Sequence, residues 1–183
     1  MNAANLVLWI RQEFPHIYEN LFLDLQTNTG VSHYRRFSNE ELHARCLRIY
    51  EGLCLWLENR DLAAVRNPAF ALGKERYENN IPLGQLVLGI LLLEKHLWLH
   101  AEDTFETSAL HEEIRQAVID FFQKTIFWAA RGYEEALEMA SKGRVNAPTQ
   151  PLIRPIEEQP RETEEGIEDM QISRGGQVAE HGG

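Results

Sequence analysis

The sequence predicts an all-α protein, a single bundle of about five to six helices followed by a disordered acidic tail. Apolar residues recur every three to four positions through most of residues 1–143. No segment alternates strictly between apolar and polar residues, and no hairpin dipeptide separates two β-branched runs. Hydrophobic residues make up 44% of the 183 residues, which is enough for one core.

The first helix is predicted from apolar residues spaced three or four positions apart, namely Ile10, Phe14, Ile17, Leu21 and Leu25. Pro15 interrupts this pattern, so the segment is either one kinked helix or two helices with Pro15 in a first turn. The polar residues 27–30 are expected to end the segment as a loop, with Gly30 at the helix C-terminus.

Ser38 is expected to begin the second helix. Glu41 follows three residues later, so the two side chains can form a capping box that satisfies free backbone N–H groups. This helix should end near Asn59. Cys46 and Cys54 lie on it about 12 Å apart, too far for a disulfide. Two unbridged cysteines are typical of a reducing cytosol.

A third helix is expected to begin at Asn67-Pro68, because the residue before a proline avoids the helical conformation. Asn79-Asn80 should close it, since asparagine tolerates the left-handed conformation found at helix ends. Pro82 is then expected in an early turn of the following helix, where its missing N–H is not needed.

The fourth helix is predicted from Leu83 to about Ala101 and is apolar on all sides as far as Leu93, which is typical of a central helix. Gly84 and Gly89 should permit close approach of neighbouring helices, because each costs ~1 kcal/mol of helix propensity against alanine. The longest apolar run is too short to span a membrane.

The last helix is expected from about Ser108 to Lys142, with Gly143 as its stop. From residue 144 the chain has four prolines, eight acidic residues against four arginines, and no aromatic residue. Such a segment buries too little apolar surface to fold, so residues 144–183 are predicted to be disordered. The buried face of the last helix is expected to consist of Ile114, Val118, Phe121, Thr125, Trp128, Gly132, Ala136 and Met139.

The formal net charge of −10 would repel a phosphate backbone or an anionic membrane, so nucleic acid and membrane surfaces are not expected partners. The first residues lack the basic region of a signal peptide. These features predict a cytoplasmic protein without membrane insertion.

Chemical motifs are few. His96 and His100 share a helix face and could bind a metal, but the Glu of the zinc-protease pattern and a third ligand are missing. The sequence has no P-loop, no GxGxxG, no GxSxG and no CxxC. We therefore expect no catalytic residue, no metal and no cofactor, and a protein that is not an enzyme.

The stretch ALGKERYENNIPLGQLV at residues 71–87 resembles the N-terminal domain family of RsbT co-antagonist proteins, of the RsbRD type. Asn80 stands where that pattern has a glycine, and Glu94-Lys95-His96 replaces a basic pair. The resemblance implies an all-α input domain of bacterial signalling and stress response, whose relatives precede a STAS domain, a kinase or another output module. The matching positions are Arg76, Ile81, Pro82, Leu83, Leu86 and Val87.

The resemblance implies a stand-alone signalling input or adaptor domain that acts by protein–protein interaction. Its partner would be a signalling output protein or a respiratory or regulatory complex, and a homodimer is a further expectation. The alternative is a helical sensor that binds a small ligand, a metal or haem. The candidate ligand or partner face consists of Arg76, Tyr77, His96, Trp98 and His100.

Overall fold

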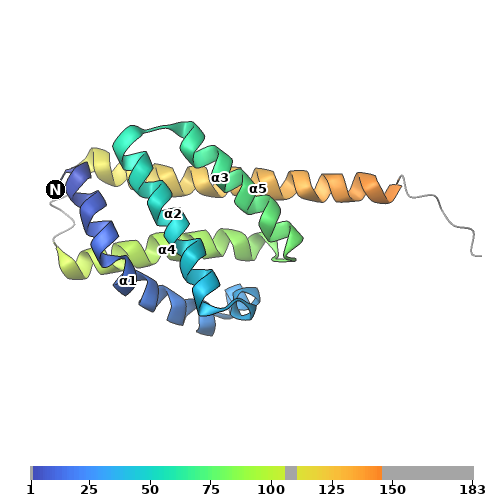
Figure 1. Cartoon of the computed structure of the whole chain (residues 1–183), viewed down its shortest axis with the longest axis horizontal. Helices are drawn as coiled ribbons and strands as arrows, with labels where there is room; N and C mark the ends of the chain where they lie inside the picture. Colours follow the sequence, from blue (N-terminus) through green and yellow to red (C-terminus); the bar gives the residue numbers. More distant parts are fainter. Residues whose placement is uncertain (1, 106–110, 146–183) are drawn as a thin grey trace, which may run out of the picture. The chain divides into compact units, whose positions relative to one another are not determined.

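The computed structural model describes residues 2–105 and 111–145, with side chains up to residue 142, and these residues contain helices and no strand (Figure 1). This confirms the predicted all-α class. No helix in the described residues combines the length and the apolarity needed to cross a membrane. The elements are α1 (Ala3–Thr27), η1 (Thr29–Arg36), α2 (Asn39–Asn59), α3 (Leu62–Glu78), α4 (Leu83–Thr104) and α5 (Glu112–Val145).

Both predicted ends of the second helix and the predicted C-terminus of the third are confirmed. Ser38 caps α2, because its Oγ accepts a hydrogen bond of 3.2 Å from the Glu41 N–H, while the Glu41 carboxylate accepts one of 2.8 Å from the Ser38 N–H. The helix ends at Asn59. Asn80 has a φ of 52°, the left-handed conformation expected after the third helix.

Two predicted boundaries are wrong. Gly30 does not end the first helix, because α1 ends at Thr27 and Gly30 lies in the 3-10 helix that follows. Pro68 lies inside α3 instead of beginning it. The start six residues earlier is fixed by Asp61, whose carboxylate accepts a hydrogen bond of 2.8 Å from the Ala63 N–H. At Pro15 the chain forms one continuous helix and not two, because α1 contains Pro15 in its interior.

The other ends differ by a few residues. The fourth helix reaches Thr104, past the expected Ala101. The fifth runs through Gly143 to Val145, so that glycine is not its stop; a glycine inside a helix costs only about 1 kcal/mol. The expected start at Ser108 lies outside the described residues, as do residues 146–183 of the predicted tail.

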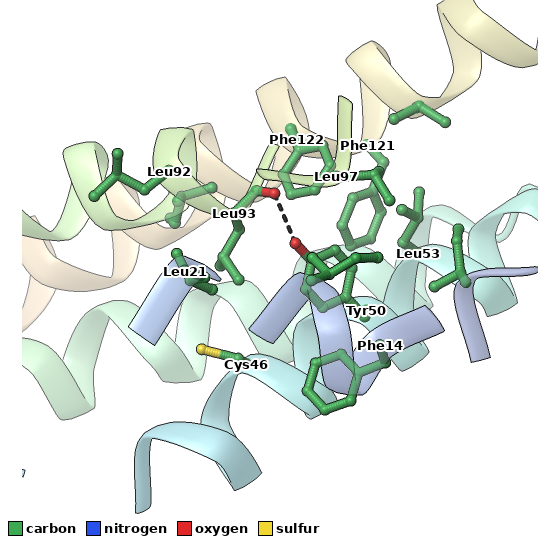
Figure 2. Close-up of a cluster of buried hydrophobic side chains, with 14 of the residues drawn as sticks. Phe14, Leu21, Cys46, Tyr50, Leu53, Leu92, Leu93, Leu97, Phe121 and Phe122 are labelled. Carbon is green, nitrogen blue, oxygen red and sulfur yellow. Dashed lines mark hydrogen bonds between the residues drawn. The ribbon is translucent and has the colours of Figure 1, made fainter. Parts of the chain in front are cut away.

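The helices pack around one apolar core. The first helix contacts α2 and α4, the 3-10 helix packs on α1 and α4, and α3 lies along α5. Two buried polar groups connect the layers. The Tyr50 hydroxyl of α2 donates to the Leu93 carbonyl of α4 at 2.7 Å (Figure 2), and the Trp56 indole N–H donates to the Ala117 carbonyl of α5 at 2.9 Å. Each buried Leu or Phe in this core contributes about 1.5–3 kcal/mol.

The third and fifth helices are in backbone contact. A Cβ built on Gly73 would lie 1.9 Å from the Ala129 carbonyl oxygen, and one on Gly132 would lie 2.0 Å from the Phe70 carbonyl oxygen. Of the two glycines expected to permit close packing in the fourth helix, Gly89 does so against the Tyr34 hydroxyl, whereas Gly84 faces open space. The crossing of α3 and α5 therefore requires glycine on both helices.

Candidate ligand-binding cleft

A cleft of about 370 Å³ lies between α2 and α3, with α5 at its floor. The two walls are joined by a short turn in which Arg60 has a φ of 53°. Because α3 is held in close contact with α5, it packs much less extensively against α2. The space left between α2 and α3 is within the size range of small-molecule sites.

Small side chains keep the cleft open. Its walls include Gly52 on α2 and Ala64, Ala69 and Ala71 on α3. A Cβ on Gly52 would meet the Phe121 ring at 3.5 Å, an ordinary contact, so alanine fits there. A longer side chain at residue 52 would extend into the cleft, which makes this position a means of filling it.

Two arginines of α2, Arg45 and Arg48, line one end of the cleft together with Glu75 of α3. Arg45 Nη1 donates to Glu75 Oε1 at 2.5 Å, and Arg76 Nη1 donates to the same oxygen at 3.2 Å. Arg48 is exposed and forms no ion pair among the described residues. One carboxylate is therefore shared by two guanidinium groups, with a third nearby.

Arg76 lies behind this end of the cleft and is only 3% exposed. Its Nε–H has no hydrogen-bond partner in the described part of the chain. Its guanidinium lies over the Tyr34 and Phe37 rings, with centroid distances of 5.7 and 5.9 Å. Burial lowers the pKa of Arg45, and the charge of Arg76 lowers it further. Positive charge is thus incompletely neutralised where a buried charge is costly.

Thr125 of α5 forms part of the cleft floor and is 4% exposed. Its hydroxyl has no hydrogen-bond partner among the described residues, although a helical threonine commonly bonds the carbonyl four residues earlier. On the opposite wall, Pro68 has no N–H to donate to the Ala64 carbonyl. Polar groups without their usual partners therefore occur on two walls of an otherwise apolar cleft.

The cysteines are not part of a reactive site. Both are buried and free. Burial raises the pKa of Cys46 to about 12 and that of Cys54 to about 11. A thiol with such a pKa is almost fully protonated at neutral pH, and the protonated form is a poor nucleophile and metal ligand.

The predicted histidine pair lies on another side of the bundle, where α4 packs on α1. His96 Nε2 donates to Asp24 Oδ2 at 2.9 Å, and the Lys95 ammonium donates to the same oxygen at 2.9 Å. His100 Nε2 donates to Glu13 Oε2 at 2.8 Å. Both histidines line a more open hollow of about 480 Å³. One ring nitrogen of each histidine is therefore paired with a carboxylate of α1.

The remaining predicted site residues lie elsewhere. Tyr77 packs edge-on against Tyr133 of α5, with ring centroids 5.4 Å apart. Trp98 is partly buried against the core. Arg76 belongs to the guanidinium cluster described above and faces the interior. The candidate face predicted from the sequence therefore divides among separate environments, of which only the two histidines share a hollow.

Sequence reasoning missed Arg45 and Arg48 as site residues. A signal was present, because the two arginines stand three residues apart on one helix and so share a face. Thr125 carried a clearer signal, since it is the one hydroxyl residue on the predicted apolar face of the last helix. A polar residue on such a face needs a partner when buried.

Comparisons with known proteins do not place the chain in a family. No family model, no curated protein and no solved structure matches it. Within residues 2–105 and 111–145, no group of three or more His, Cys, Asp or Glu side chains could hold a metal ion.

Proposed function

We propose that this protein is a signalling input module that binds a small molecule in the cleft between α2, α3 and α5. One observation carries the proposal: an apolar cleft of about 370 Å³ is lined by a buried threonine hydroxyl without a partner and by an arginine without an ion pair in the described residues. A largely apolar pocket with a few polar groups is the usual form of a small-molecule site.

Binding there could alter the bundle because the cleft walls belong to different helices. The second helix is tied to α4 and α5 through Tyr50 and Trp56, whereas α3 is tied to α5 through Gly73 and Gly132. A ligand that contacts both walls favours one spacing of α2 and α3. Such differential binding is what a sensor requires to change its state.

A neutral apolar fluorophore, N-phenyl-1-naphthylamine, tests the proposal. The wild-type protein should bind it with one-to-one stoichiometry and enhanced fluorescence. Gly52→Leu should abolish binding, because the new side chain fills the cleft, while Gly52→Ala should retain it. Thermal unfolding of both variants verifies folding. Equal binding by wild type and a folded Gly52→Leu protein would contradict the proposal.

A second candidate function, an adaptor that binds a protein partner directly, is favoured by the end of α5. This helix extends past α3 in Figure 1, and Leu137 and Met139 are 51% and 59% exposed there. The resemblance of residues 71–87 to RsbT co-antagonist domains is consistent with such a role. A contiguous exposed apolar patch is typical of contact surfaces, and these two side chains would contribute to one around the end of α5.

Light scattering coupled to size-exclusion chromatography tests this candidate. If α5 mediates self-association, the wild-type protein should elute as a dimer, and Leu137→Lys with Met139→Lys should convert it to a monomer. Leu8→Lys is a matched control, since Leu8 is similarly exposed at 56% but lies on α1. A monomeric wild type that remains monomeric at high concentration would contradict the dimer version.

A further inference from the structure

We infer that the cleft ligand is a medium-chain monocarboxylate whose carboxylate binds Arg45 and Arg48 and whose hydrocarbon chain lies along the small side chains of the cleft. The inference rests on the proposed function, because it names the chemical class of the ligand for the same site. Charge, shape and polar groups support it separately.

The arginine end of the cleft carries a net positive charge that one anion would neutralise. Arg45, Arg48 and Arg76 bring three guanidinium groups. Glu75 pairs with Arg45 and Arg76, and the charge of Glu41 acts on Arg45. Glu41 is engaged in the cap of α2. One positive charge remains, although the whole protein carries −10. A single carboxylate restores neutrality, and guanidinium groups bind carboxylates in bidentate geometry.

The accessible partner for that carboxylate is Arg48. Arg45 already donates to Glu75 and lies over the Phe37 ring, with its Cζ 4.4 Å from the centroid. Arg48 lines the same end of the cleft, is exposed, and has no ion pair among the residues described. A ligand carboxylate would give Arg48 its counter-ion and add a second acceptor for Arg45.

The rest of the cleft suits a hydrocarbon chain. Away from the arginines its lining is apolar or small, with Gly52, Val65, Ala69 and Phe121. Glu75, beside the arginines, and Ala64, at the other end of the α3 wall, are about 16 Å apart along that helix at ~1.5 Å per residue. That distance suits a medium-length chain. Burying each methylene group contributes about 0.8 kcal/mol, so the chain would supply most of the affinity.

Thr125 distinguishes this site from a merely apolar gap. Its side chain is on the floor of the cleft, and its hydroxyl is buried without a partner in the described residues. An apolar residue of the same shape, valine, would avoid the cost of about 1–3 kcal/mol for an unpaired buried group. We therefore assign the hydroxyl to positioning the ligand.

The test is displacement of bound N-phenyl-1-naphthylamine by decanoate, by 1-decanol and by inorganic phosphate. Decanoate should displace the fluorophore at least tenfold more effectively than decanol, and phosphate should not displace it. Arg48→Gln should weaken decanoate at least tenfold and leave decanol unchanged. Arg131→Gln on α5 is the matched control, because it removes the same charge from an exposed arginine outside the cleft.

The outcomes separate the inference from the proposed function. If the fluorophore binds but decanoate and decanol compete equally, or Arg48→Gln has no effect, the carboxylate inference is wrong and the cleft still binds small molecules. If phosphate alone displaces the fluorophore, the site recognises an inorganic anion and the inference is also wrong. Failure of the fluorophore to bind wild type overturns both. Thermal unfolding of Arg48→Gln, compared with Arg48→Lys, establishes that any loss is not unfolding.

Discussion

The contact between α1 and α4 and the cleft between α2 and α3 differ in how far their polar side chains are paired. Where α1 meets α4, His96 and His100 are each paired with a carboxylate, and only the Trp9 indole N–H lacks a partner among the described residues. Where α2 meets α3 and α5, Arg76 Nε and the Thr125 hydroxyl are buried without partners. The two histidines that the sequence singles out are paired, whereas the floor of the cleft contains a buried hydroxyl without a partner among the described residues.

This difference separates polar residues that stabilise helix packing from polar residues that are available to a ligand. A paired histidine and aspartate stabilise the contact between two helices. A buried threonine hydroxyl without a partner costs stability, and a polar group of a ligand in the cleft would supply that partner.

The largest effect is expected where α3 is held against α5. Gly132→Val should destabilise the protein by more than about 3 kcal/mol, because a Cβ there would lie 2.0 Å from the Phe70 carbonyl oxygen. Gly84→Ala is the control, and should stabilise α4 by about 0.5–1 kcal/mol, because nothing lies within 4 Å of the new Cβ. Urea denaturation measures both. A Gly132→Val protein as stable as wild type would show that the crossing is not constrained as described.

Removing the carboxylate charge of Glu75 at the cleft should lower the free energy of unfolding more than removing that of Asp24 between α1 and α4. Glu75→Gln leaves Arg45 and Arg76 without their shared acceptor charge and should lower the free energy of unfolding by about 2 kcal/mol, after allowance for the partial exposure of Glu75. Asp24→Asn should cost less than about 1 kcal/mol at pH 7, because Lys95 is half exposed. Equal losses of unfolding free energy for the two variants in urea denaturation would contradict the difference between the two regions.

Thr125→Val should raise the free energy of unfolding of the ligand-free protein by about 1 kcal/mol, because it removes an unpaired buried hydroxyl while keeping the shape. Thr104→Val is a useful comparison, since that hydroxyl is exposed and donates to the His100 carbonyl at 2.7 Å. It should change stability little. A destabilised Thr125→Val protein would mean that the hydroxyl has a partner in solution.

The smallest expected effect is the pH dependence of stability that comes from Asp24, at the contact between α1 and α4. Burial alone would raise the pKa of Asp24, but hydrogen bonds from Lys95, His96 and Asn28 outweigh it and lower the pKa to about 2. A carboxylate whose folded pKa is lowered contributes stability above its unfolded pKa of about 4, and this contribution is lost as the pH falls from 4 to 2.

Asp24→Asn should therefore flatten the stability curve between pH 4 and 2 by up to about 1 kcal/mol, relative to wild type. Denaturation curves at half-unit pH steps measure it. The control is Asp61→Asn, since Asp61 caps α3 on another part of the chain. Identical curves for wild type and Asp24→Asn would show that the pairing does not lower the pKa of Asp24.

Most of the fold could be predicted from the sequence, because periodicity and caps act locally. Ser38 with Glu41 and the left-handed Asn80 were correctly placed for this reason. Pro68 was misplaced because its local preference was outweighed by the cap at Asp61 and by the packing of α3 on α5. Backbone contact at Gly73 depends on both helices, so the sequence of one helix could not predict it.

The candidate site was less predictable than the fold. Arg76 was singled out, but as part of a surface, whereas it is buried. The cleft arises from the distance between α2 and α3, which depends on how each packs on α5. No single segment encodes that distance. The partnerless state of the Thr125 hydroxyl likewise follows only from knowing its neighbours.

The most direct test of the cleft as the binding site is a backbone amide NMR titration of the ¹⁵N-labelled protein with N-phenyl-1-naphthylamine. Binding in the cleft should give saturable shifts at Gly52, Ala69 and Thr125, with little change at Leu23 and His100, which line the hollow between α1 and α4. Shifts concentrated at Leu23 and His100, with none in the cleft, would contradict it.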